Sequence, residues 1–377
     1  MSESKSSTFL KLPAEQLFAD ELAALAANDH GHRPEGWNLS PAAVKTFIVG
    51  GTVAGPDGRS KSAIEIPRKY YGDDIVVERA IVSLLGNRGL LLVGEPGTAK
   101  SMLSELLAAA ISGDSTLTIQ GTAGTTEDQV KYSWNYGLLL TEGPSMRSLV
   151  PGPLFSGMKL GKVVRFEEIT RCQAEIQDTL VSLLSDKTLL IPEFGEADRV
   201  LMAARGFNVI ATANLRDKGV NEMSSALKRR FNFETVPPIA DKQMEIELVR
   251  RQTELLLREA DVQMKYPDDT LELLVTTFQD LRMGKTDEGA TIEKPSTVMS
   301  TAEAVAVSFA ACLDAHYFGS GKVGGEHITR QMLGTVFKDN PEDARKLAHY
   351  LNVVGKVRAH RGGAWRAFYE SRGVLKA

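Results

Sequence analysis

Short apolar runs alternate with helical patterns in the middle of the sequence. Four runs have the length and composition of buried strands, at residues 89–94 (GLLLVG), 117–120 (LTIQ), 163–166 (VVRF) and 207–213 (FNVIATA). Helical spacing precedes the first run, in IVVERAIVSLLGN from Ile75, and follows it, in MLSELLAAAI from Met102. Strands that alternate with helices predict an α/β fold, in which helices cover both faces of a parallel sheet.

The pattern changes on either side of this region. After Ile239, the segments KQMEIELVRRQTELLL, DTLELLVTTFQDL and MSTAEAVAVSFAACL all have helical periodicity. They predict a second, mostly helical domain. Residues 1–60 contain one amphipathic segment, roughly residues 13–27, and a stretch rich in Gly and Pro. We expect these residues to form an N-terminal extension packed on a larger body.

The first strand leads into GEPGTAKS, residues 94–101. A phosphate-binding loop of the form G-x-x-x-x-G-K-[ST] has glycine where this chain has Ala99, so we expect helical dihedral angles at Ala99. Main-chain N–H groups and the start of the following helix would hold the phosphates of ATP, with Lys100 at the β and γ phosphates and the Ser101 hydroxyl at Mg²⁺. An ordinary strand-to-helix turn with a surface lysine is the alternative. The predicted nucleotide-binding residues are Gly94, Glu95, Pro96, Gly97, Thr98, Ala99, Lys100, Ser101 and Met102.

Two acids end the strand at residues 163–166. In such a position Glu167 would face Mg²⁺ and Glu168 would activate the attacking water. The usual first acid is an aspartate, and the extra methylene of Glu167 predicts altered metal geometry and slow hydrolysis. Arg165 interrupts the apolar strand, and we expect it to pair with a nearby acid.

Polar residues after the later strand complete the candidate site. Asn214 ends the run FNVIATA, where an amide would hold the attacking water and sense the γ phosphate. In SSALKRRFNFE, Arg229 and Arg230 are candidates to reach a neighbouring subunit and stabilise charge in the transition state. Taken alone, the asparagine fits a turn and the arginines fit a basic helix end.

In this order the motifs resemble those of AAA+ ATPases, and more narrowly the MoxR family, whose loop has the form GxPGxAK[ST] with alanine in it. Residues 152–187, from GPLF through FEEITR to the helix with paired leucines, resemble another segment of that family and place Arg171 in its I-x-R motif. The resemblance covers residues 72–233 well and the helical part loosely. It implies an AAA+ core at residues 61–238 with an insertion at about 122–155, a helical lid at 239–340 and a basic helical C-terminal extension at 341–377.

Within that resemblance, two segments have particular roles. The insertion holds Gly124, Gly137 and Gly143 and would form a helix flanked by a β-hairpin. Relatives have a lid arginine in a Ser-Pro-Arg context, where this chain has Lys294-Pro295-Ser296-Thr297, so Lys294 is the candidate substitute. GSGK at residues 319–322 lacks the preceding strand and the loop spacing, so we do not assign it to phosphate.

The resemblance implies a ring ATPase, with a hexamer as the expected homo-oligomer, that remodels a protein client beside a protein with a von Willebrand factor A domain. An alternative from a different class is an McrB-like motor acting on nucleic acid. It would use ALKRRF and a basic C-terminal stretch that contains Trp365 and Tyr369 among the cations Arg345, Lys346, Lys356, Arg358, Arg361, Arg366, Arg372 and Lys376. A third interpretation is a nucleotide-gated scaffold with little turnover.

Composition limits the remaining classes. The formal net charge of -4 gives no overall attraction to nucleic acid. No apolar run approaches the roughly 20 residues of a membrane helix, and the polar N-terminus does not have the pattern of a secretory signal. We therefore expect a cytoplasmic location without membrane insertion. The two cysteines, Cys172 and Cys312, are too isolated to predict a disulfide framework or a zinc site.

Overall fold

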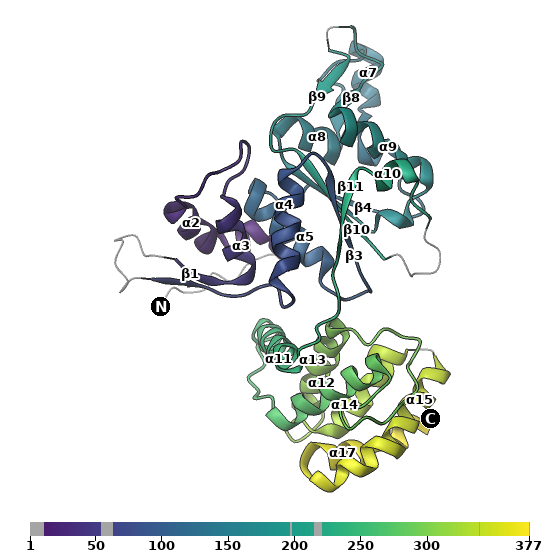
Figure 1. Cartoon of the computed structure of the whole chain (residues 1–377). Coiled ribbons are helices and arrows are strands. Elements are labelled where there is room, and N and C mark those ends of the chain that lie inside the picture. The colour runs from purple at the N-terminus through teal and green to yellow at the C-terminus, as the bar shows by residue number, and fades with distance from the viewer. Residues whose placement is uncertain (1–10, 54–62, 197, 215–220, 339, 377) are drawn as a thin grey trace. The chain divides into compact units, whose positions relative to one another are not determined.

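Figure 1 shows a computed structural model of the chain, which describes residues 11–53, 63–196, 198–214, 221–338 and 340–376. The chain forms two compact units. The first contains residues up to Gly94 and Ala99–Val236, and the second contains Glu95–Thr98 and the residues from Pro237 onward. Within the described residues, no helix combines the length and the apolar character needed to cross a membrane.

The first unit is built on a five-stranded parallel sheet. Its strands are β3 (Gly89–Val93), β4 (Thr118–Gln120), β7 (Val163–Glu167), β10 (Asn208–Ala213) and β11 (Phe231–Thr235), in the spatial order β11-β3-β10-β7-β4. This sheet and the helices around it confirm the predicted α/β class. Strand β11 was not predicted, because FNFET alternates between apolar and polar residues over only five positions.

Helices cover both faces of this sheet (Figure 1). Side chains alternate between the faces along each strand, so Leu90 and Leu92 of β3 pack with α4 and α5, whereas Leu91 and Val93 pack with α8 and α9. Helix α4 begins at its N-cap Asp73, whose carboxylate accepts a hydrogen bond from the amide of Ile75. The helices of this unit are α1 (Ala14–Leu17), α2 (Ala19–Asn28), α3 (Pro41–Val49), α4 (Asp74–Leu85), α5 (Lys100–Ser112), α6 (Glu127–Val130), α7 (Tyr136–Glu142), α8 (Pro153–Leu160), α9 (Ala174–Asp186) and α10 (Ser225–Lys228).

The described part of the N-terminal region packs against the α5 side of the sheet. Trp37 and Phe47 lie in the same buried cluster as Leu107 of α5. Strand β1 (Gly51–Val53) pairs antiparallel with β2 (Ile64–Ile66). Residues 11–53 therefore contribute to the core of the first unit.

Two further small antiparallel pairs lie outside the main sheet. Strand β5 (Tyr132–Trp134) pairs with β6 (Leu149–Pro151), and helix α7 connects them without a single buried residue. Strand β8 (Thr188–Leu190) pairs with β9 (Val200–Met202). The side chains of Tyr132 and Trp134 donate hydrogen bonds to the carboxylate of Glu193, which joins the first pair to the segment between β8 and β9.

The second unit is a helical domain with one apolar core. Residues 341–376, predicted as a C-terminal extension, supply Tyr350, Leu351 and Phe368 to the same core as the earlier helices. The α-helices are α11 (Lys242–Glu259), α12 (Asp268–Met283), α13 (Thr301–Tyr317), α14 (Gly325–Met332), α15 (Pro341–Tyr350), α16 (Lys356–Arg358) and α17 (Gly363–Glu370). Short 3-10 and π segments occupy Ile169–Arg171 of the first unit and Leu333–Phe337, Leu351–Gly355, Ala359–Arg361 and Ser371–Lys376 of the second.

The predicted basic surface near the C-terminus is wrong for Arg358. This side chain is only 2% exposed, and its guanidinium pairs with Asp280 at 2.7 Å and with Glu288 at 2.6 Å. Its guanidinium carbon, Cζ, lies 4.9 Å from the centroid of the Trp365 ring. A buried cation that is held by two acids is not available to nucleic acid.

Candidate functional site

The loop after β3 has the backbone of a tight phosphate-binding turn. Gly97 has a φ of 74° and Ala99 a φ of 66°, and α5 starts directly afterwards at Lys100. The expectation of helical dihedral angles at Ala99 is therefore wrong, because this residue is the left-handed N-cap of α5. For alanine, this left-handed conformation is about 1–2 kcal/mol less favourable than the right-handed region. Glycine does not have this conformational cost.

Lys100 lies at the first position of α5 and is only 6% exposed. Its ammonium group donates a hydrogen bond of 3.0 Å to the carbonyl of Gly94, so the side chain bends back across the loop. In the same loop, the Thr98 hydroxyl donates to the carbonyl of Glu95 at 2.9 Å. The lysine thus lies at the start of α5, where a helix N-terminus favours anions.

The carboxylate of Glu167 meets the start of α5 from the end of β7. Its Oε2 accepts hydrogen bonds from the hydroxyls of Ser101 at 2.7 Å and Thr212 at 2.8 Å, and its Oε1 accepts from Ser104 at 2.5 Å. Burial alone would raise the pKa of Glu167, but the hydrogen bond from Ser104 and the charge of Arg165 outweigh it. The pKa lies below its ordinary value, so the group is ionised at neutral pH.

Arg165 is the partner of this acid, as expected from the sequence. One of its terminal nitrogens donates to Glu167 Oε1 at 2.8 Å. The two residues are two positions apart on one strand and therefore face the same side of the sheet. The cation in the apolar strand thus has a physical reason, which is to compensate a buried carboxylate.

Glu168 follows in a left-handed conformation, with a φ of 55°. Its main-chain N–H donates to the Thr212 hydroxyl at 3.0 Å, and its carboxylate pairs with Arg171 at 3.2 Å. The left-handed turn directs the second acid away from the strand, so that Glu167 and Glu168 have different surroundings. The first acid is buried, whereas the side chain of the second is 29% exposed.

Strand β10 lies between β3 and β7 and brings Asn214 to the same edge of the sheet. Ala213 pairs with Val93 directly before the phosphate loop, and Ala211 pairs with Phe166 before the acids. Asn214 is 2% exposed at the end of this strand. Because the carboxyl ends of parallel strands meet at one edge, the loop, the acids and the asparagine lie together.

The two candidate arginines lie farther along, between α10 and β11. Arg230 donates hydrogen bonds to the hydroxyl of Ser185 at 2.6 Å and to the carbonyl of Ala226 at 2.7 Å. Arg229 ends α10 and is exposed. The structure thus holds Arg230 against its own subunit, whereas Arg229 extends into solvent.

Ser104 and Thr212 belong to the site but were not predicted. The sequence holds a signal for each. Ser104 follows Ser101 by three residues and so shares a helix face with it. Thr212 is a polar residue that follows the apolar run Val209–Ala211 near the carboxyl end of β10. A search for polar residues at these periodicities, on elements that flank a phosphate loop, would have found both.

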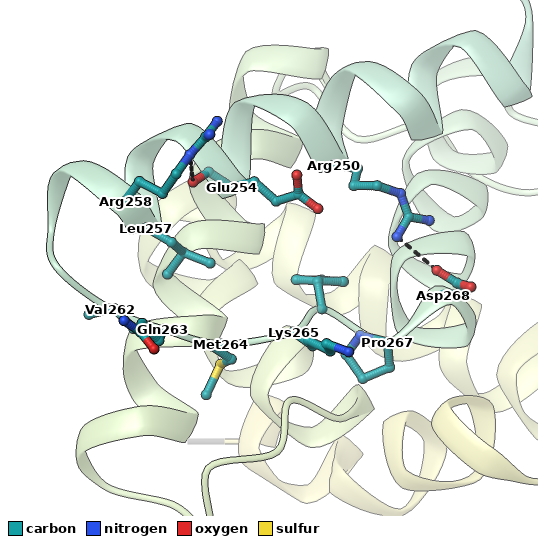
Figure 2. Close-up of a pocket in the computed structure, with 11 residues that line it drawn as sticks. Arg250, Glu254, Leu257, Arg258, Val262, Gln263, Met264, Lys265, Pro267 and Asp268 are labelled. Atoms are coloured by element: carbon teal, nitrogen blue, oxygen red, sulfur yellow. Dashed lines mark hydrogen bonds and ion pairs between the residues drawn. The ribbon is translucent and has the colours of Figure 1, made fainter. Parts of the chain in front are cut away.

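Among the described residues from Pro237 onward, Lys294 is the one candidate for the nucleotide site, and its side chain is exposed. The neighbouring Ser296 and Thr297 are held by Asp343, whose carboxylate accepts hydrogen bonds from both main-chain amides and both hydroxyls. Figure 2 shows a hollow of about 850 Å³ in this domain, lined by one face of α11 and by residues 262–268. Its charged groups have both signs, and Arg250 pairs with Asp268 at 2.7 Å.

The parallel sheet, the phosphate loop after β3 and the acidic pair after β7 together define a P-loop ATPase. Residues 89–231 match the family model of an AAA domain of the dynein-related subfamily, and residues 243–376 match that of a YehL-like AAA+ ATPase C-terminal domain. Over 361 residues, the chain is 49% identical to the uncharacterized protein YehL of Escherichia coli strain K12, and the match covers 96% of each chain. The chain belongs to the MoxR-type AAA+ ATPases, in the YehL-like family.

More distant similarities were also found. The chain is 26% identical over 192 residues to the chaperone MoxR1 of Mycobacterium tuberculosis, a match of 51% of this chain and 47% of that relative. A crystal structure of NtrX from Brucella abortus in complex with ADP has a TM-score of 0.49 and 12% identity, over 81% of this chain and 69% of that one. Membership of the AAA+ ATPases places the chain in a class of nucleotide-binding proteins.

Proposed function

We propose that this chain is a ring-forming ATPase that couples ATP binding and hydrolysis to the remodelling or maturation of a protein client. The observation that supports this most is the meeting of Lys100 and Ser101 with Glu167 and Glu168 at one edge of the sheet. These groups are those needed to hold a triphosphate, a metal ion and an attacking water. A protein with a von Willebrand factor A domain is the partner expected from the MoxR resemblance.

The phosphate loop would bind ATP through its main-chain amides and Lys100. The ammonium group of Lys100 donates a hydrogen bond to the carbonyl of Gly94 and would turn to the β and γ phosphates when ATP binds. Asn214, at the end of β10, would orient the attacking water. Glu168 would accept the proton of that water once its carboxylate leaves Arg171.

The residues present fit a magnesium ion beside the triphosphate. The Ser101 hydroxyl donates its hydrogen to Glu167, which leaves the oxygen lone pairs of Ser101 available to a metal. Bound Mg²⁺ would neutralise charge on the β and γ phosphates. Glu167, the second residue proposed at the metal position, accepts the hydrogen of Ser101 and so lies next to this ligand.

An arginine from the neighbouring subunit would complete each site. Arg230 is one candidate, and in that role it would have to release Ser185 and the carbonyl of Ala226. Arg229 would need no such change, because it is already exposed. A cation supplied in trans accelerates related phosphoryl transfers by about 10³ to 10⁵.

An exposed apolar surface on the first unit supports the proposal that the client is a protein. Helix α7, between β5 and β6, exposes Leu140 to 87% and Tyr136 to 69%. Exposed apolar side chains that gather on one short helix favour contact with another polypeptide. By contrast, burial of Arg358 removes one of the cations on which binding of nucleic acid depended.

Mixed rings test the proposal. A variant Arg229→Ala/Arg230→Ala should bind ATP through its own Lys100 but hydrolyse almost none, and Lys100→Ala should lose tight ATP binding. Mixing the two should restore some hydrolysis, because an intact nucleotide site can then meet an intact arginine of its neighbour. ATPase activity is measured across mixing ratios after subunit exchange. Failure to recover activity in confirmed mixed rings would show that the arginines do not act in trans.

A further inference from the structure

Arg165 is an unusual residue for the interior of an apolar strand, and it is 8% exposed. Burying a guanidinium costs several kcal/mol unless its donors are satisfied. All five of its N–H donors have acceptors within the first unit. The acceptors are Ser104 Oγ at 3.0 Å, the Ser115 carbonyl at 3.1 Å, Thr118 Oγ1 at 3.4 Å, the Ser101 carbonyl at 3.0 Å and Glu167 Oε1 at 2.8 Å.

The carboxylate of Glu167 is equally well occupied. An ionised carboxylate has about four acceptor positions. Those of Glu167 are filled by three hydroxyls and by the guanidinium of Arg165. A metal ion could bind this carboxylate directly only by displacing one of these donors. Ser101, whose oxygen keeps its lone pairs, has no such obstacle.

We propose that Arg165 is a positioning residue that neutralises Glu167, restricts it to orienting the Ser101 hydroxyl, and so weakens the dependence of nucleotide binding on Mg²⁺. This inference rests on the nucleotide and metal site proposed above. It assigns direct metal contact to Ser101 and gives Glu167 an indirect role. The pair of charged groups beside the metal position then contributes no net charge.

The electrostatic consequence has a definite direction. A lone carboxylate next to the site attracts Mg²⁺ and repels the phosphates of metal-free ATP. Arg165 weakens both effects, so the affinity for ATP with and without Mg²⁺ should differ less than it would with the acid alone. A unit charge within one or two side-chain lengths of the metal, screened by solvent at the open edge of the sheet, changes that ratio by about tenfold.

The length of Glu167 is part of the same arrangement. Its carboxylate reaches Ser101 and Ser104 on α5 and Thr212 on β10 at the same time. An aspartate would be one methylene shorter and would lose at least one of these contacts. Arg165, Ser104 and the longer acid therefore form one buried unit, and the usual aspartate would not fill it.

The test measures binding and needs no turnover. The affinity of the full-length chain for a fluorescent non-hydrolysable ATP analogue is determined with excess Mg²⁺ and with EDTA, at pH 8. The ratio of the two affinities is compared among variants. Arg165→Met, which exposes the site to the full charge of Glu167, should raise the ratio of the affinity with Mg²⁺ to the affinity with EDTA about tenfold. Glu167→Gln, which leaves Arg165 uncompensated, should lower it.

Two further variants separate charge from structure. Arg165→Lys keeps the cation with fewer donors and should keep the wild-type ratio within about twofold while lowering the melting temperature. Arg165→Met/Glu167→Gln buries no charge at either position and should also return the ratio close to that of the wild type. If Arg165→Met alone does not fold, the double variant keeps the test decisive. The ratio should fall in Glu167→Gln and return close to the wild-type value when Arg165→Met is added.

The outcomes distinguish the two proposals. If the wild type binds the analogue but Glu167→Gln and all Arg165 variants that fold have the same ratio, Arg165 is only structural and this inference is wrong. If the folded wild type binds no analogue under either condition, the proposed nucleotide site is itself refuted, and the inference with it.

Discussion

Replacement of Ala99 by glycine should stabilise this protein, although glycine normally weakens helices. Ala99 has a φ of 66° and a ψ of 22°. An L-residue pays about 1–2 kcal/mol in this left-handed region, and glycine does not. Glycine also increases the conformational entropy of the unfolded chain, which lowers the free energy of unfolding by about 0.4–1 kcal/mol. The expected net gain for Ala99→Gly is about 0.5–1 kcal/mol.

Ala108→Gly is the matched control, because it makes the same chemical change in the interior of α5. Ala108 is fully buried and helical. Glycine there should cost about 1 kcal/mol in helix propensity and up to roughly 0.8 kcal/mol for the lost buried methyl group. The two variants should therefore differ by about 2 kcal/mol, with opposite signs relative to the wild type.

Thermal and urea unfolding, followed by circular dichroism without nucleotide, measure this difference. For a unit of roughly 150–250 residues, 1 kcal/mol corresponds to a shift of about 2–4 °C in the melting temperature. The transition of the first unit should move up for Ala99→Gly and down for Ala108→Gly. A loss of stability in Ala99→Gly equal to that of the control would refute the left-handed assignment of residue 99.

The remaining predictions concern the nucleotide site and the helical domain. Lys100→Ala should weaken binding of a fluorescent ATP analogue by about 100-fold, because the loop loses its charged hydrogen-bond donor; unchanged affinity would remove the site assignment. Glu168→Gln should keep analogue binding yet lower the ATPase rate by about 10² to 10⁴, since an amide cannot accept the proton of water; an unaltered rate would exclude it as the base. Arg358→Met should lower the stability of the helical domain by about 3–5 kcal/mol in urea unfolding, because it leaves a buried acid unpaired, whereas Arg361→Ala, on an exposed pair, should cost less than about 1 kcal/mol. Finally, burial alone would raise the pKa of Asp343, but the donors of residues 296–297 outweigh it and lower the pKa to about 2. Since its ordinary pKa is 3.8, the stability that this carboxylate contributes is present above about pH 4 and is lost as the pH falls toward 2. The melting temperature of Asp343→Asn should therefore depend less on pH over that range than that of the wild type.

The sheet was largely predictable because its central strands are short and mostly apolar. The runs at 89–94, 163–166 and 207–213 became β3, β7 and β10, since strands buried on both faces consist mainly of apolar side chains. The edge strand β11 alternates between apolar and polar residues, but its burial does not follow that alternation, since Phe231 and Glu234 are buried and Phe233 is 39% exposed. Its pattern is too short to distinguish from a loop by periodicity alone.

Local sequence could not identify the partners of buried charges. Arg165 looked anomalous in its strand, and only one partner, a nearby acid, could be suggested. Its other acceptors come from α5 and the residues before β4, up to 64 positions away in the chain. Arg358 was misplaced on the surface for the same reason, because Asp280 lies 78 residues away from it. Long-range pairs of this kind leave no periodic signal in the sequence.

Backbone strain marks the candidate site more sharply than the motifs alone. Five non-glycine residues among those described have positive φ, and two of them lie at the site. Ala99 directly precedes α5, and Glu168 directly follows β7. Each holds its chain in a conformation that costs about 1–3 kcal/mol and persists only when surrounding contacts enforce it. At Glu168 the enforcing contacts include the hydrogen bond from its N–H to Thr212, whose hydroxyl also binds Glu167. The turn that directs the second acid outward thus depends on the network that keeps the first acid buried, so a change at Thr212 should alter the positions of both carboxylates together.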